Sequence, residues 1–150
     1  MNNTLLAPLI IILLELKKTR YLELRKTKIK NKARQHVREL LYSYKDMSRE
    51  ISSIRDSILY PNEKVSQSLE NSAISVVNEK QIAFRAKFIA ITDDVLRNNA
   101  ETYYEIIAMK FFDERYFSWV AIAQKVGYSE EGCKKIERKI VDEIAERLGF

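Results

Sequence analysis

Apolar positions recur with a helical spacing through residues 33–58. The steps between them alternate between four and three residues: Ala33, Val37, Leu40, Tyr44, Met47, Ile51, Ile54 and Ile58. No glycine or proline interrupts this pattern before Pro61. The spacing predicts a single helix of about thirty residues, with one apolar stripe along its length.

A second stripe with the same spacing follows a polar segment. Its positions are Ile74, Val77, Gln81, Phe84, Phe88, Ile91 and Val95. The intervening residues 60–72 are polar and rich in turn-forming side chains, which predicts a loop. Two stripes joined by a loop predict an antiparallel helical hairpin. The alternative is a homodimer through the same stripes, with Gln81 as a polar residue that sets the register.

The first sixteen residues, which precede both stripes, contain an apolar run, Leu5–Leu14. Pro8 suits the first turn of a helix, and Thr4 or Asn3 could cap it. Ten residues are too few to cross a bilayer, which takes about twenty, so no stable membrane insertion is expected. Three interpretations of residues 1–16 stay open. The run packs on a partner or on the protein's own core, it results from a translation start placed too far upstream, or it contacts anionic lipid.

The composition excludes several classes of protein. With three glycines, one cysteine and one histidine, the chain lacks the turns of a β-rich fold, a glycine-rich phosphate loop, a Cys/His zinc site and an intrachain disulfide. Neighbouring acids such as Asp93 and Asp94 lie about 100° apart around a helix and do not converge on one site. We therefore expect an all-α protein that is not an enzyme, with no catalytic residues, metal or cofactor. A single cysteine and the lack of a secretory signal favour the cytoplasm.

Positive charge is concentrated near the start of the chain. The segment Lys17–Arg38 holds ten basic residues and one acid, Glu23. Such a run favours a polyanionic partner. It could be a solvated helix face, an auxiliary contact with the DNA backbone, or a contact with RNA or a membrane.

The last third of the chain carries the signals of two capped helices joined by a tight turn. Ser118 and Ser129 each precede a helical pattern, and serine is a favoured N-cap. Gly127 stands where the first pattern stops, and glycine adopts the left-handed conformation at a helix C-terminus without a Cβ penalty. The small residue and the five apolar residues typical of a helix-turn-helix all occur around it: Ala123, Ile122, Val126, Tyr128, Cys133 and Ile136.

This pattern predicts a helix-turn-helix domain in residues 99–150, after an N-terminal helical region of residues 1–98. An ordinary helical corner is the alternative. The second helix has an inward apolar stripe formed by Cys133, Ile136, Ile140, Ile144 and Leu148.

Polar residues at the start of that second helix are the candidates for contact with DNA. They are Ser129, Glu130, Glu131, Lys134, Lys135 and Arg138, together with Lys125 on the preceding helix. Lysine and arginine bind phosphates or guanine edges, and a glutamate accepts from cytosine N4. The alternatives are a solvated face for the cations and dipole-compensating caps for Glu130 and Glu131. Because this segment carries no net charge, general attraction to DNA would come from Lys17–Arg38 or from recruitment by another protein.

The C-terminal segments Tyr104–Phe112, Trp119–Ser129 and Lys134–Phe150 resemble the fourth region of bacterial sigma factors. They resemble more closely the phage and prophage transcriptional regulators of the RinA and ArpU type. The resemblance covers about residues 101–150 and implies activation of late phage genes in a Gram-positive host. It implies double-stranded DNA as the partner, with the positions given above as the reading residues.

Two features depart from that family. Gly132-Cys133 stands where a bulkier polar residue and a β-branched one are usual, and the apolar first fourteen residues have no counterpart. Two other functions remain as alternatives. One is a sigma-like module that acts mainly through RNA polymerase, and the other is a small terminase-type subunit for DNA packaging.

Overall fold

The computed structural model describes residues 6–59 and 72–150, and every regular element in these two ranges is helical. The prediction of an all-α fold is confirmed. The elements are α1 (Leu6–Tyr42), α2 (Tyr44–Leu59), α3 (Ser72–Arg97), α4 (Glu101–Ile107), the π-helix η2 (Ala108–Phe112), α5 (Trp119–Val126) and α6 (Glu130–Leu148).

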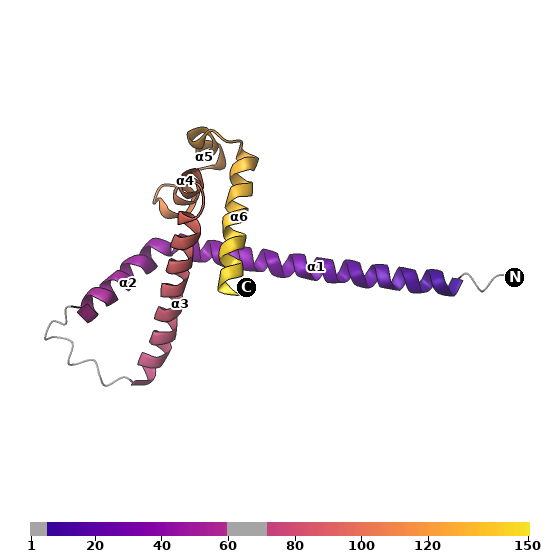
Figure 1. Cartoon of the computed structure of the whole chain (residues 1–150), viewed down its shortest axis with the longest axis horizontal. Helices are drawn as coiled ribbons and strands as arrows, with labels where there is room; N and C mark the ends of the chain where they lie inside the picture. Colours follow the sequence, from indigo (N-terminus) through magenta and orange to yellow (C-terminus); the bar gives the residue numbers. More distant parts are fainter. Residues whose placement is uncertain (1–5, 60–71) are drawn as a thin grey trace.

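Helix α1 is a rod of 37 residues whose N-terminal half extends away from the rest of the molecule (Figure 1). It begins at Leu6 with Pro8 in its first turn, as predicted, while Asn3 and Thr4 lie outside the described residues. The large apolar side chains between residues 6 and 16 are each 54–61% exposed. The interpretation that this run packs on the protein's own core is therefore wrong. Among the described helices, none is both long and apolar enough to cross a membrane.

A single helix over residues 33–58 was expected, and this expectation is wrong because α1 and α2 are separated at Ser43. The Ser43 amide donates to the carbonyl of Leu40 at 3.1 Å, a shorter step than in an α-helix, and the next helix starts again from Ser43. The turn brings the ring of Tyr44 onto Phe112, with a centroid distance of 4.4 Å. The Tyr44 hydroxyl donates to Asp93, and burial together with this bond raises the pKa of Tyr44.

Helices α2 and α3 meet beside α6 and spread apart toward their other ends (Figure 1). Phe88 and Val95 on α3 are fully buried, whereas Phe84 and Gln81 are exposed. The predicted hairpin is thus confirmed only in part: α2, in place of the longer helix, packs on α3 where α2 begins and α3 ends. Most of the predicted loop 60–72, and the side chains of residues 74 and 77, lie outside what the structure describes.

One hydrophobic core joins the two halves of the chain. Its buried members come from α1, α3, α4, η2 and α6: Val37, Leu41, Phe88, Val95, Leu96, Ile107, Phe111, Phe112, Ile140, Val141, Ile144 and Ala145. The boundary expected between residues 98 and 99 falls in the turn before α4, but the core crosses it. The position of α6 is therefore set by α1 and α3 as well as by its own domain.

Candidate nucleic-acid interface

The turn between α5 and α6 joins two capped helices, as the predicted helix-turn-helix requires. The Ser118 hydroxyl accepts from the amide of Ala121 at 3.2 Å, and Ser129 accepts from Gly132 at 3.0 Å. Gly127 has φ of 75° and ψ of 21°, a left-handed conformation that costs an L-residue about 1–2 kcal/mol. Both predicted N-caps and the predicted glycine C-cap are confirmed.

The inward face of α6 is wider than the predicted stripe. Cys133, Ile140 and Ile144 are fully buried, and burial raises the pKa of the Cys133 thiol. Ile136 and Leu148 are only half-buried, while Glu137 and Val141 are buried as well. The reason is that α1 crosses α6 and covers a second face of it, next to the stripe.

Two arginines fasten α1 to α6. The guanidinium of Arg38 donates to both carboxylate oxygens of Glu137, at 2.6 and 2.9 Å, and the Glu137 side chain is 4% exposed. One helical turn earlier, Arg34 donates to Asp142 at 2.7 and 2.8 Å, which lowers the pKa of Asp142. Lys30 adds a contact of 3.3 Å to the same carboxylate. The basic run thus neutralises two acids of α6, and its members Lys30, Arg34 and Arg38 have a structural role.

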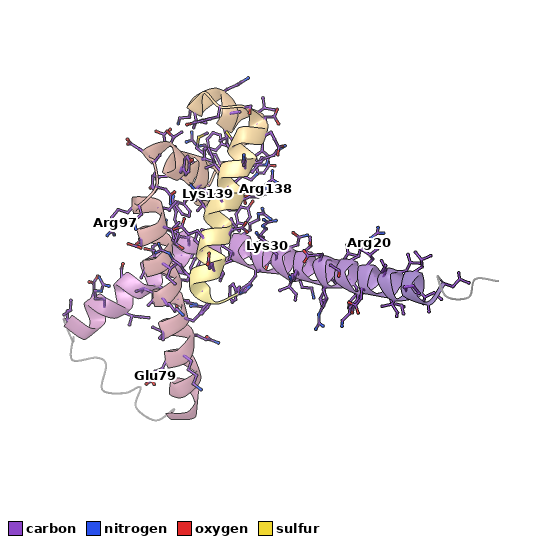
Figure 2. All side chains as sticks on the ribbon, turned by 45° about the vertical axis from the view of Figure 1, so that its right-hand side comes forward. Arg20, Lys30, Glu79, Arg97, Arg138 and Lys139 are labelled. Atoms are coloured by element: carbon purple, nitrogen blue, oxygen red, sulfur yellow. The ribbon has the colours of Figure 1, made fainter. Side chains whose placement is uncertain are left out.

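The N-terminal half of α6 lies beyond this crossing. Glu131, Lys135 and Arg138 are exposed there, and Lys134 is half-buried. Figure 2 shows Arg138 and its neighbour Lys139 on this part of the helix, with Lys30 on the α1 rod below. The cationic flank of α6 is therefore open to solvent and is not covered by the long helices.

The predicted DNA contacts do not all have free side chains. Arg138 binds Glu131 at 2.6 Å, and Lys134 lies 3.9 Å from Glu130. Both pairs are exposed, and such pairs contribute about 0–1 kcal/mol, so a stronger anion can replace the carboxylates. In the described ranges, Lys135 and Lys125 have no carboxylate within 4.0 Å. The hydroxyl of Ser129 accepts from the Gly132 amide as the cap of α6.

Sequence reasoning missed two cations near this flank. Lys139 is exposed one turn after Lys135, and its ammonium lies 5.3 Å from the ring centroid of Tyr103. Lys110 on η2 reaches the start of α5. The four-residue step from Lys135 to Lys139 was visible in the sequence, but the position of Lys110 depends on how η2 packs.

The described residues include no group of three or more His, Cys, Asp or Glu side chains placed to hold a metal ion. No family model matches the chain, no curated protein matches it, and no solved structure matches it. Any functional interpretation therefore depends on the residues and on their geometry.

Proposed function

We propose that this protein binds double-stranded DNA in a sequence-specific manner, with the N-terminal half of α6 in the major groove. The observation that supports this proposal most directly is the pair of capped helices hinged at Gly127. The hinge leaves Lys135 and Arg138 exposed on the second helix. In this class of motif the second helix reads base edges and the first helix crosses the backbone.

The α1–α6 clamp adds an electrostatic argument. The helix-turn-helix segment carries equal numbers of acids and bases, but Glu137 and Asp142 are bound by Arg38 and Arg34. The charges that remain on the exposed flank are then Glu130, Glu131, Lys134, Lys135, Arg138 and Lys139. With four cations and two acids, this flank has a net positive charge, which attracts phosphate.

The regulatory part of the proposal depends on the resemblance to phage and prophage regulators. In that interpretation the protein is an activator of late phage genes, located in the cytoplasm. A sigma-like action through RNA polymerase is the second candidate. It is favoured by the exposed acids Glu130 and Glu131 at the tip of the motif, where they could contact a basic protein surface.

The test begins with selection of binding sequences from a randomised duplex library, followed by fluorescence anisotropy at several salt concentrations. We expect affinity to fall steeply with salt, because bound cations displace counterions from the duplex. The variant Lys135→Ala/Arg138→Ala should bind the selected sequence at least tenfold more weakly, since the removal of one phosphate or base interaction costs about 1–3 kcal/mol.

The matched control is Lys80→Ala/Lys87→Ala, which removes the same charge from exposed positions of α3. Equal affinities for the two double variants would contradict a role for α6 in recognition. Binding to polymerase core without any affinity for DNA would favour the sigma-like candidate. An assembly of eight or more subunits in solution would favour packaging.

A further inference from the structure

A cavity of about 310 Å³ opens where α1, η2, α5 and α6 meet. Its walls include Arg38, Lys110, Trp119, Lys134, Glu137 and Arg138. Four of these six side chains are cations and one is an acid. A cavity of this size lies at the lower end of the range for ligand sites and has room for a phosphate group with its adjoining sugar.

The single acid of the cavity is already neutralised. The Glu137 carboxylate accepts hydrogen bonds from Nε and Nη2 of Arg38, so three positive charges remain on Lys110, Lys134 and Arg138. The carboxylates that pair with Lys134 and Arg138 belong to exposed residues outside the cavity. An anion that entered the cavity would meet no unpaired carboxylate from its walls.

Lys110 is held in place without loss of its charge. Its ammonium lies 4.8 Å from the ring centroid of Trp119 and 5.1 Å from that of Tyr116, and it has no carboxylate within 4.0 Å in the described part of the chain. A cation over aromatic rings is held in position by electrostatic attraction to them, while its field remains available to an anion. This is the side chain best prepared to bind a phosphate.

The location of the cavity indicates where that phosphate comes from. Trp119 is the first residue of α5, and Lys134 lies on the exposed part of α6. When the second helix of such a motif occupies the major groove, the first helix lies against the sugar-phosphate backbone at the edge of that groove. The cavity is therefore next to the path of one DNA strand.

We propose that this cavity is the seat of one backbone phosphate of the bound duplex, with Lys110 and Lys134 as its ligands and Trp119 beside the sugar. This inference depends on the proposed function. It adds a residue outside the helix-turn-helix, Lys110, to the interface. It also makes the site depend on the docking of α1, because Arg38 neutralises the one acid in its wall.

The test uses Lys110→Gln, with Lys110→Arg as the charge-preserving variant and Lys87→Gln on α3 as the control. We expect Lys110→Gln to weaken binding about fivefold on every duplex sequence and to reduce the slope of log affinity against log salt by about 0.9. Lys110→Arg should restore most of the affinity, and Lys87→Gln should behave as the unmodified protein.

A second measurement identifies the phosphate. Each backbone position of the selected duplex is replaced in turn by an uncharged methylphosphonate. One position should weaken binding of the unmodified protein clearly more than binding of Lys110→Gln, because the variant has already lost one of the two cations at that phosphate. Trp119 is the only tryptophan in the chain, so its fluorescence reports directly on occupation of the cavity.

The outcomes are distinct. If the protein binds DNA but Lys110→Gln keeps its affinity and salt slope, the cavity is not a phosphate seat and the proposed function is unaffected. If inorganic phosphate alone changes Trp119 fluorescence as strongly as the duplex does, the backbone is the wrong source. If the protein binds no duplex at all, the proposed function fails and this inference fails with it.

Discussion

The two ends of helix α1 contrast sharply, although they belong to one continuous rod. Residues 6–14 are apolar around the whole circumference, and every large apolar side chain there is more than half exposed. At the other end, Val37 and Leu41 are fully buried. A helix that is apolar on all sides is normally buried in a large core or a membrane, whereas a one-sided stripe is typical of a helix that packs on one neighbour and keeps its other face in water. Burial here follows the one-sidedness of the pattern and not the number of apolar residues.

Charge follows the same division. Near the docked end, Arg34 and Arg38 flank the stripe and form ion pairs with Asp142 and Glu137 on α6. Further out on the rod, cations such as Arg20 are exposed, on the part of α1 that lies away from the other helices (Figure 2). One basic run thus has a structural part and a part that is available to a polyanion.

The strongest test of this contrast makes the same substitution at both ends of α1. Leu41→Ala should lower the free energy of unfolding by about 3 kcal/mol, because a fully buried leucine leaves a cavity. Leu14→Ala should change it by less than about 0.5 kcal/mol, since Leu14 is 59% exposed. Urea denaturation followed by Trp119 fluorescence measures both. A comparable loss for Leu14→Ala would mean that the outer rod is buried against another surface.

The next largest effect concerns the clamp between α1 and α6. Arg38→Met keeps most of the side-chain volume but leaves the buried carboxylate of Glu137 without a partner, and we expect a loss of about 2 kcal/mol. Adding Glu137→Gln should recover much of that loss. Destabilisation of the double variant equal to the sum of the single variants would contradict a direct pair.

The caps of α5 and α6 and the Arg38–Glu137 pair show what the sequence could and could not reveal. Ser118, Gly127 and Ser129 act on backbone groups within four residues of themselves, so their roles in the turn were predictable. Arg38 and Glu137 are 99 residues apart, and no local pattern links them. The docking of α1 therefore could not be predicted from the sequence, and neither could the burial of Val141 that results from it.

The break at Ser43 has the same origin. The stripe from Ala33 to Ile58 fits one straight helix as well as two helices with a turn between them. What decides is the stacking of Tyr44 on Phe112, a contact with a different part of the chain. The cavity beside Lys110 could not be predicted from the sequence either, because its walls come from four separate elements.

A smaller effect should appear on acidification. The hydrogen bonds from Arg34 lower the pKa of Asp142 in the folded state, whereas an aspartate in the unfolded chain has a pKa of about 3.9. The pair therefore stabilises the fold fully above that unfolded value, and its contribution disappears as the pH falls further, through the folded pKa. Asp142→Asn should cost about 1 kcal/mol at neutral pH.

The free energy of unfolding of Asp142→Asn should also change less between neutral and acidic pH than that of the unmodified protein. Asp46→Asn, on the exposed surface of α2, is the control because it leaves the α1–α6 clamp intact. Equal acid sensitivity of Asp142→Asn and the unmodified protein would show that Arg34 and Asp142 are not paired in solution.

The smallest effect on folding is expected from removal of residues 1–16. The side chains described in this stretch are exposed, so deletion should leave the urea midpoint and the Trp119 signal unchanged within error. It should also leave the salt dependence of DNA binding unchanged, because every cation from Lys17 onward is retained. Sedimentation velocity should instead show less association at high concentration, since a large apolar surface is gone. The contrast between the two ends of α1 fails if the shortened protein unfolds more easily, because residues 1–16 would then be supporting the fold.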